Sequence, residues 1–200
     1  MSAEPLSSRI IFPLKPIPAR AKADRTVTLT PCPRACSTSS STARRFDFTT
    51  RNRRPPRVPV NVLLSLGYSL LVRDLTVICY AVGFDPFIAF YHQPRFGRPA
   101  LALDLMEGFR PLSVDSAVLT AINIGMVKGD DFLEVGRAVT LTPRGRKRFI
   151  TAYEQRMDAL VTHPLFGYRA SYRRVLEIQT RLLARVVTGE LGRYPGFETR

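Results

Sequence analysis

Residues 60–82 read VNVLLSLGYSLLVRDLTVICYAV, and this long apolar segment sets the architecture that the rest of the chain must fit. About 20 apolar residues are enough for a helix to cross a bilayer, so the segment passes that test by length. Arg73 and Asp74 stand inside it, however, where each charge would be costly in lipid. We therefore predict the buried central helix of a soluble bundle, with these two charges at a pocket or an exposed edge.

The segments that follow also predict helices. Gly83 is a natural stop for the first helix, and a short second helix is predicted over residues 86–91. A long helix is predicted over residues 100–123, bent or divided in two by Pro111.

The second half of the chain predicts one hairpin and two more helices. Residues 132–135 and 138–141 can pair across a two-residue turn. Thr142-Pro143 marks the start of a helix that runs to about residue 161. The last helix is predicted from about residue 167 or 168 to residue 187, with an apolar stripe on one side and arginines outside it. The fold class is therefore mainly α, with one minor β-hairpin.

The chain changes character near residue 59. Residues 1–59 contain nine of the 16 prolines and carry 12 Lys or Arg against 3 Asp or Glu, without a sustained helical or strand period. We expect residues 1–45 to form a low-order, disordered segment rich in Pro, Arg and Ser. Residues 46–200 are then expected to form one helical domain.

The charge balance is strongly basic, with 30 Lys and Arg against 16 Asp and Glu and a formal net charge of +14. Such an excess indicates a polyanionic partner, with nucleic acid first and an anionic membrane surface second. Arginine supplies most of the excess, and its planar guanidinium makes bidentate contacts with phosphate. This preference favours nucleic acid.

The three cysteines give no disulfide framework and fit a reducing compartment, so we expect a cytoplasmic protein. Cys32 and Cys36 have a zinc-like gap, but no second Cys/His pair follows to complete four ligands, and we assign no zinc. Prolines interrupt the amino terminus, which lacks the continuous apolar region of a signal peptide.

Residues 92–111, HQPRFGRPALALDLMEGFRP, hold the candidate site. Asp104 and Glu107 lie three residues apart and share one face of a helix. A loop could return His92 over that face, so that one imidazole and two carboxylates converge on a divalent metal such as Mn²⁺ or Mg²⁺. The alternative is a structural histidine beside a solvated acidic face. His163, followed by Pro164, is interpreted as a structural helix-end residue.

Several segments resemble the CRISPR-associated spacer-acquisition endonuclease/integrase family, Cas1. The resemblance covers residues 46–200, and the pattern is similar to members associated with the Cas4 exonuclease, including fused forms. The segments that carry it are NVLLSLGYSLLVRDLT, FDPFIAFYHQPRFGRPALALDLMEGFRP, AYEQRMDALVTHP and YRRVLEIQTRLLARVVTGE.

The resemblance implies a helical catalytic domain that binds Mn²⁺ or Mg²⁺. It also implies DNA as substrate, a homodimer, and a small second Cas protein with which short DNA segments are inserted into a repeat array. His92 matches the metal-binding histidine of the family, Glu107 a direct metal ligand, and Asp104 a second ligand or water-orienting group. Nearby Arg95, Arg98 and Arg110 could hold the scissile phosphate or its flanking backbone, or could be ordinary surface charge.

The chain also departs from the family pattern. Members place a β domain before the helical one, and we expect that β domain to be absent here. The remaining metal ligand of the family is a Glu, for which Glu4 is the candidate, although Pro5 replaces the Gly that usually follows. Residues 13–45 resemble nothing in the family, so we expect a truncated or frameshifted copy.

Together with this resemblance, the sequence predicts a metal-dependent DNA endonuclease/integrase of adaptive antiviral defence. Its predicted catalytic residues are His92, Asp104 and Glu107. The alternative is a catalytically inactive, truncated DNA-binding or interaction fragment of the same family. A basic membrane-associated protein, which rests on residues 60–82 alone, ranks last, and no membrane partner is expected.

Overall fold

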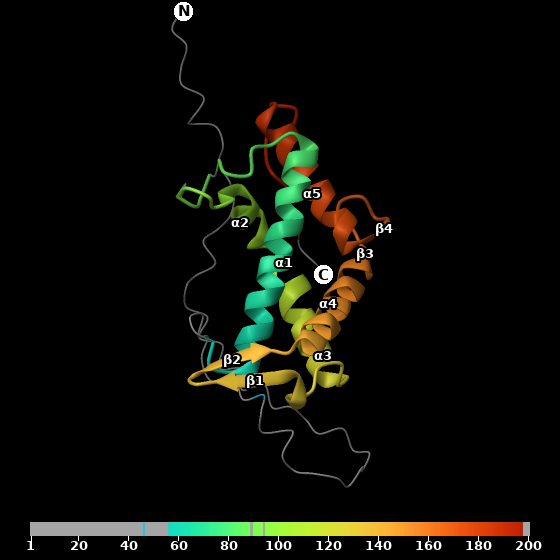
Figure 1. The fold of residues 1–200 in the computed structure, drawn as a ribbon. Helices are drawn as coiled ribbons and strands as arrows, with labels where there is room; N and C mark the ends of the chain where they lie inside the picture. Colours follow the sequence, from blue (N-terminus) through green and yellow to red (C-terminus); the bar gives the residue numbers. More distant parts are fainter. Residues whose placement is uncertain (1–45, 47–55, 89, 94, 198–200) are drawn as a thin grey trace, which may run out of the picture.

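The computed structural model describes Phe46 and residues 56–88, 90–93 and 95–197. Helix α1 (Pro59–Val82) is the long axis of these residues, and the other helices lie along it (Figure 1). The mainly α fold is confirmed. The predictions for residues 1–45, including Glu4 and the Cys32/Cys36 pair, lie outside the described residues.

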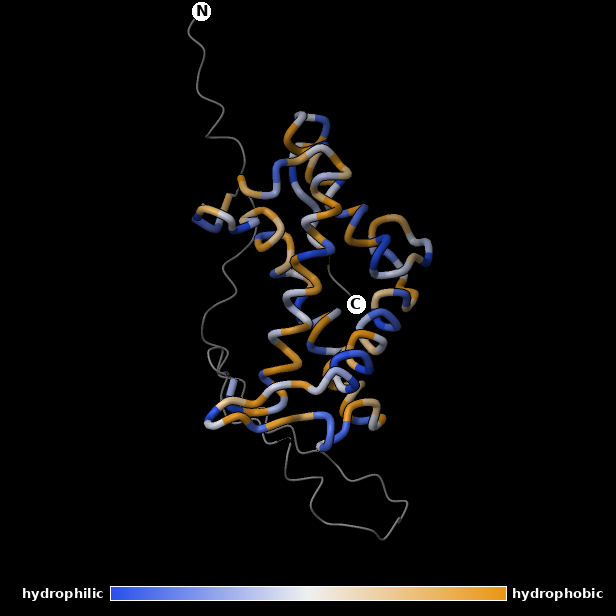
Figure 2. Tube along the Cα trace, viewed as in Figure 1, coloured by the Kyte–Doolittle hydropathy of each residue, from blue (hydrophilic) through white to orange (hydrophobic). Residues whose placement is uncertain are grey.

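Helix α1 begins and ends where the sequence predicted. Pro59 stands at its start, and Gly83 ends it in the left-handed conformation (φ 101°), with its N–H donating to the Cys79 carbonyl at 3.1 Å. It has the length and hydropathy of a membrane span, but much of its surface packs inside the bundle. Figure 2 shows hydrophobic residues along most of its length.

The predicted helix over residues 100–123 is divided, as expected. Helix α2 (Ala100–Met106) is followed by a wide π-helical segment, η3 (Arg110–Asp115), and then by α3 (Ser116–Asn123). Pro111 lies at the start of the wide segment, where its missing N–H breaks the regular hydrogen-bond ladder. The predicted helix over residues 86–91 is wrong: the described part of this segment forms turns and bends.

The first hairpin matches its predicted bounds. After a short 3₁₀ turn, η4 (Gly129–Asp131), strand β1 (Phe132–Val135) pairs antiparallel with β2 (Ala138–Leu141) in the register Val135↔Ala138. Helix α4 (Pro143–Asp158) follows, and the Thr142 hydroxyl accepts a hydrogen bond from the Gly145 N–H at 3.0 Å.

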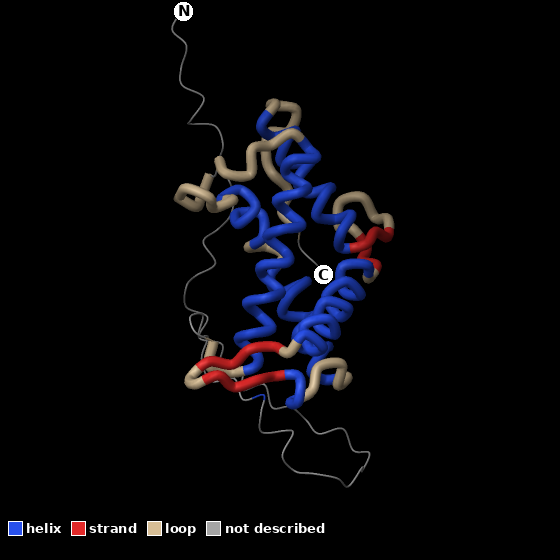
Figure 3. Tube along the Cα trace, viewed as in Figure 1, coloured by secondary structure: helices blue, strands red, loops and turns tan. Residues whose placement is uncertain are grey.

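A second hairpin was not predicted. Helix α4 ends at Asp158 instead of continuing to residue 161, because β3 (Leu160–Thr162) pairs with β4 (Arg169–Ser171). Helix α5 (Tyr172–Val187) therefore begins a few residues later than expected. Figure 3 shows the two hairpins at separate places on the helical body.

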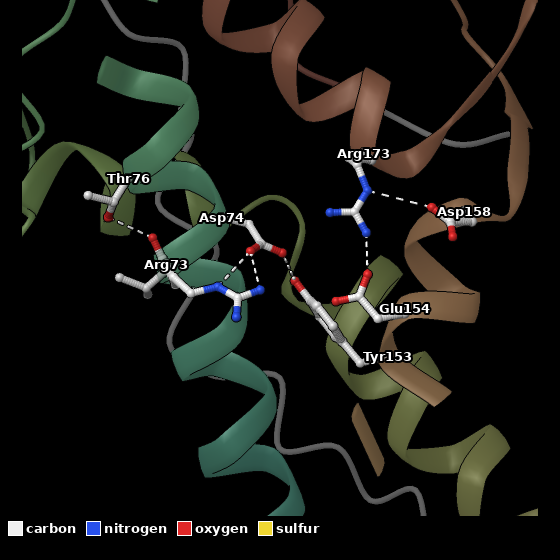
Figure 4. A network of polar contacts seen from close by, with 8 residues as sticks. Arg73, Asp74, Thr76, Tyr153, Glu154, Asp158 and Arg173 are labelled. Carbon is white, nitrogen blue, oxygen red and sulfur yellow. Dashed lines mark hydrogen bonds and ion pairs between the residues drawn. The ribbon is translucent and has the colours of Figure 1, made fainter. Parts of the chain in front are cut away.

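A polar network joins α1, α4 and α5 (Figure 4). Asp74 accepts from the Tyr153 hydroxyl at 2.9 Å and from the Arg73 guanidinium at 2.7 Å. Burial, together with the adjacent charge of Asp74, raises the pKa of the Tyr153 phenol, which stays protonated and donates. The Arg73 side chain is 58% exposed and lies at an exposed edge, as predicted, whereas the Asp74 side chain is 11% exposed and faces Tyr153.

The core closes tightly around α1 at Gly67. A Cβ atom there would lie 2.5 Å from Val114 Cγ1 and 3.3 Å from the Phe149 ring, on η3 and α4 respectively. Both of these side chains are fully buried. The absence of a side chain at residue 67 therefore sets how closely η3 and α4 approach α1.

Gly67→Ala should lower the free energy of unfolding by about 1–2 kcal/mol, because overpacking outweighs the better helix propensity of alanine. Urea unfolding followed by circular dichroism measures the change. Ser69→Ala, on the exposed side of the same helix, is the matched control and should change stability by less than about 0.5 kcal/mol. Equal effects of the two substitutions would contradict this account of the packing.

After α5 the chain folds back, and the Phe197 ring stacks on Phe109 at 5.6 Å and lies edge-on to His163 at 5.5 Å. His163 is fully buried, so its interpretation as a structural residue fits, although it follows β3 instead of ending a helix. Its Nδ1 accepts from the Leu165 N–H at 3.3 Å, which places the ring proton on Nε2. The Gln179 amide beside Nε2 is best assigned with its oxygen as the acceptor, because that buried oxygen otherwise has no partner.

Burial lowers the pKa of His163 below its ordinary value of 6.5, because the apolar surroundings disfavour the charged ring. As the pH falls through about 6.5, His163 therefore binds a proton in the unfolded chain but stays neutral in the folded chain. The contribution to stability is complete above pH 6.5 and is lost as the pH falls below it.

His163→Gln should be less stable than the wild type near about pH 7.5 but lose less stability on going to about pH 5.5. Thermal unfolding over this pH range measures both effects. Leu165→Ala, in the same turn and without a titratable side chain, should keep the wild-type pH dependence. An unchanged pH dependence in His163→Gln would refute the assignment.

Candidate metal centre

Asp104 anchors the loop that precedes α2. Its side chain is almost completely buried, and one carboxylate oxygen, Oδ2, accepts from the N–H groups of Phe90 (3.1 Å) and Tyr91 (3.0 Å). The other oxygen, Oδ1, accepts from the N–H of His92 at 3.0 Å. Three successive amides therefore point at one negative charge, which explains why this segment does not continue as a helix.

The same carboxylate orients the His92 ring. His92 Nδ1 lies 2.6 Å from Asp104 Oδ1, and because a carboxylate is an acceptor, Nδ1 carries the proton. The lone pair of Nε2 is then left for a ligand. The His92 side chain is 22% exposed, so the ring that carries this nitrogen is partly accessible to solvent. A carboxylate behind an imidazole is the usual arrangement around a metal-binding histidine.

Glu107 lies at the end of α2 but engages a different partner. Its Oε2 accepts from Arg110 Nη1 at 3.0 Å, and the Arg110 guanidinium stacks over the Tyr68 ring at 4.8 Å. Among the residues that the structure describes, no three His, Cys, Asp or Glu side chains lie close enough together to hold a metal ion. The structure thus brings His92 and Asp104 together and holds Glu107 with Arg110, and the metal site stays a prediction.

Arg95 and Arg98 lie in the exposed loop before α2, where the Arg98 N–H donates to the Arg95 carbonyl at 3.0 Å. Neither forms an ion pair within the described part of the chain. Three exposed aromatic rings in the same loop were not predicted, although Phe96 stands between the two arginines and aromatic rings beside arginines are a recognisable nucleic-acid pattern. These rings belong to Phe90, Tyr91 and Phe96.

Comparison with known proteins gives a consistent picture. The family model described as CRISPR associated protein Cas1 matches residues 36–155. The chain is 59% identical over 155 residues to a CRISPR-associated exonuclease Cas4/endonuclease Cas1 fusion from Geobacter sulfurreducens, a match that covers 78% of this chain and 28% of that protein.

Solved structures show the same likeness. A Cas1 protein from Thermotoga maritima superposes with a TM-score of 0.67 at 32% identity, over 73% of this chain and 46% of that one. A chain of a Cas6-RT-Cas1–Cas2 complex gives a TM-score of 0.65 at 28% identity, over 78% of this chain and 17% of that one. The chain thus spans less than half the length of each of these proteins.

Asp104→Asn should lower the free energy of unfolding by about 1–3 kcal/mol, because an amide group offers one acceptor fewer to the amides of residues 90–92. Hydrogen exchange of those amides should become faster at the same time. Asp85→Asn is the matched control, since an amide oxygen can still accept from the Phe87 N–H. Unchanged exchange in Asp104→Asn would show that the carboxylate does not hold the loop.

Proposed function

Because the chain belongs to the CRISPR-associated protein Cas1 family, we propose that it is a metal-dependent DNA endonuclease/integrase that inserts spacer DNA into a CRISPR array. The observation that carries the proposal is the His92–Asp104 pair, which lies inside the matched segment and leaves one imidazole nitrogen for a ligand. The excess of basic residues agrees with a DNA substrate.

The donor set fits a hard-to-borderline divalent ion. His92 Nε2 and the Glu107 carboxylate would hold Mn²⁺ or Mg²⁺, and the buried Asp104 would act by orienting His92 instead of binding directly. A bound ion would neutralise phosphate oxygens and activate a 3′-hydroxyl or a water. The family's remaining Glu ligand falls on Glu4, outside the described residues.

The other residues of the site have supporting roles. Arg110 holds Glu107 through its ion pair and would release or share it when a cation binds. Arg95 and Arg98, which are exposed and unpaired within the described part, would hold the phosphate backbone next to the scissile bond.

The proposed partners follow from the family. We propose a homodimer that acts with a small second Cas protein, as the name of the Cas6-RT-Cas1–Cas2 complex suggests for that assembly. The Geobacter sulfurreducens fusion similarly makes the Cas4 exonuclease a possible companion. We propose a cytoplasmic location without a membrane partner, and the packing of α1 in the core of the helical bundle speaks against a membrane span.

A second candidate function is a catalytically inactive DNA-binding fragment of the family. The observation that favours it is the Glu107–Arg110 ion pair, which satisfies the second proposed ligand without a metal. The two candidates differ in one property, which is metal-dependent cleavage.

In a nuclease assay on branched DNA with Mn²⁺, His92→Ala and Glu107→Ala should each reduce cleavage by at least about 100-fold, because each removes a metal ligand. Glu190→Ala, an exposed glutamate beyond α5, is the control and should cleave like the wild type. Unchanged cleavage in both site variants would reject the assignment. Salt-sensitive DNA binding without cleavage by the wild type would support the second candidate.

A further inference from the structure

Among the described residues, the basic side chains that form ion pairs make up a neutralised group, and the others remain unpaired. The arginines of α5 belong to the neutralised group, although the sequence places them in one conspicuous cluster. Arg173 pairs with Glu154 and, at 3.5 Å, with Asp158. The remaining pairs are Arg174–Glu177, Arg181–Glu177 and Arg185–Glu190.

A second set of basic side chains lies at the end of the molecule formed by β1, β2, η4 and the start of α4, which we call the hairpin end. Six exposed basic side chains lie there, and none forms an ion pair within the described residues. Two exposed acids, Asp130 and Glu134, stand against them and leave an excess of four positive charges. The six are Arg57, Lys128, Arg137, Arg144, Arg146 and Lys147.

Packing explains which residues of the run RGRKR (144–148) remain available. Residue 145 must be a glycine because Asp131 packs closely against it: a Cβ atom there would lie 2.6 Å from the Asp131 Cβ. Arg148 is used internally, since its Nη1 donates to the buried Asp131 carboxylate at 2.8 Å. The other three side chains are exposed at the first turns of α4, which contain no acidic residue, so the positive end of the helix dipole adds to their field.

The hairpin end is far from the candidate metal centre. Helix α1 has 24 residues and therefore spans about 36 Å. The segment before it meets β2 through the Val139 N–H and the Pro56 carbonyl at 2.9 Å, whereas the segment after it meets α2 through the Leu101 N–H and the Pro86 carbonyl. Figure 1 shows the β1–β2 hairpin and α2 near different ends of α1. The two basic regions are thus separate surfaces.

We propose that the hairpin end is a second binding surface for the phosphodiester backbone of duplex DNA, distinct from the candidate metal centre. Arginine and lysine side chains together with a helix N-terminus are the groups that contact DNA backbone without reading sequence. Duplex DNA carries about one charge per 1.7 Å, so side chains spread over several segments can each meet a phosphate. The proposal rests on the proposed function only in taking DNA as the partner.

The test is the salt dependence of binding by the full chain to a blunt duplex of arbitrary sequence, measured by fluorescence anisotropy. The triple variant Arg144→Gln, Arg146→Gln, Lys147→Gln should bind at least about ten-fold more weakly than the wild type at moderate salt. Its slope of log affinity against log salt should be shallower by about 2.7, since each lost phosphate contact removes about 0.9. The double variant Arg174→Gln, Arg181→Gln is the control and should keep the wild-type slope, because both arginines are already paired.

Several outcomes would overturn the proposal. One is an unchanged slope in the triple variant and also in a second variant, Lys128→Gln with Arg137→Gln, when circular dichroism shows both to be folded. Another is that the hairpin end binds an acidic polypeptide while the triple variant retains the full affinity of the wild type for duplex DNA. Failure of the proposed enzymatic function is a separate result. If the wild type does not cleave DNA but the triple variant loses duplex binding, the binding surface at the hairpin end is supported and the catalytic proposal is rejected.

Discussion

The burial of α1 is the constraint on which the described structure depends. A 24-residue helix with this apolar surface is stable in water only when other elements cover it, and α2, η3, α3, α4 and α5 all pack against it. Gly67 sets the closest approach, because Val114 and Phe149 occupy the space where a side chain would be. The two charges on α1 are accommodated differently: the largely buried Asp74 accepts a hydrogen bond from the Tyr153 hydroxyl, and Arg73 extends toward solvent.

The positions of the residues in the candidate centre depend on this packing. Helix α2 lies against α1, so the buried Asp104 carboxylate is fixed by the core, and that carboxylate in turn fixes three loop amides and the His92 ring. A loop of exposed rings and arginines is thus attached to the core through Asp104. Glu107, at the end of α2, is held instead by a half-buried ion pair with Arg110.

The sequence predicted what depends on local periodicity, capping and turns. It located α1, the break near Pro111, the β1–β2 hairpin and the start of α4, because each has a local signal. It failed at residues 86–91 and at β3–β4, where three-residue strands and amides captured by Asp104 depend on contacts made after folding. The candidate site residues were predicted from spacing and resemblance, including the approach of His92 to the acidic face. Spacing does not show, however, that Asp104 faces inward while Glu107 faces Arg110.

Net charge has the same limitation as a predictor. The sequence shows an excess of arginine but not which guanidinium groups have a carboxylate beside them. The acids that pair with the arginines of α5 lie one helical turn away, on the adjacent α4, or just beyond the end of α5, so that a cluster of four arginines has little free charge. At the hairpin end a buried Asp131 captures Arg148 alone and leaves its neighbours unpaired. Electrostatic attraction of a polyanion depends on this unpaired charge. The hairpin end is therefore a stronger candidate than the surface of α5 for binding the backbone of duplex DNA.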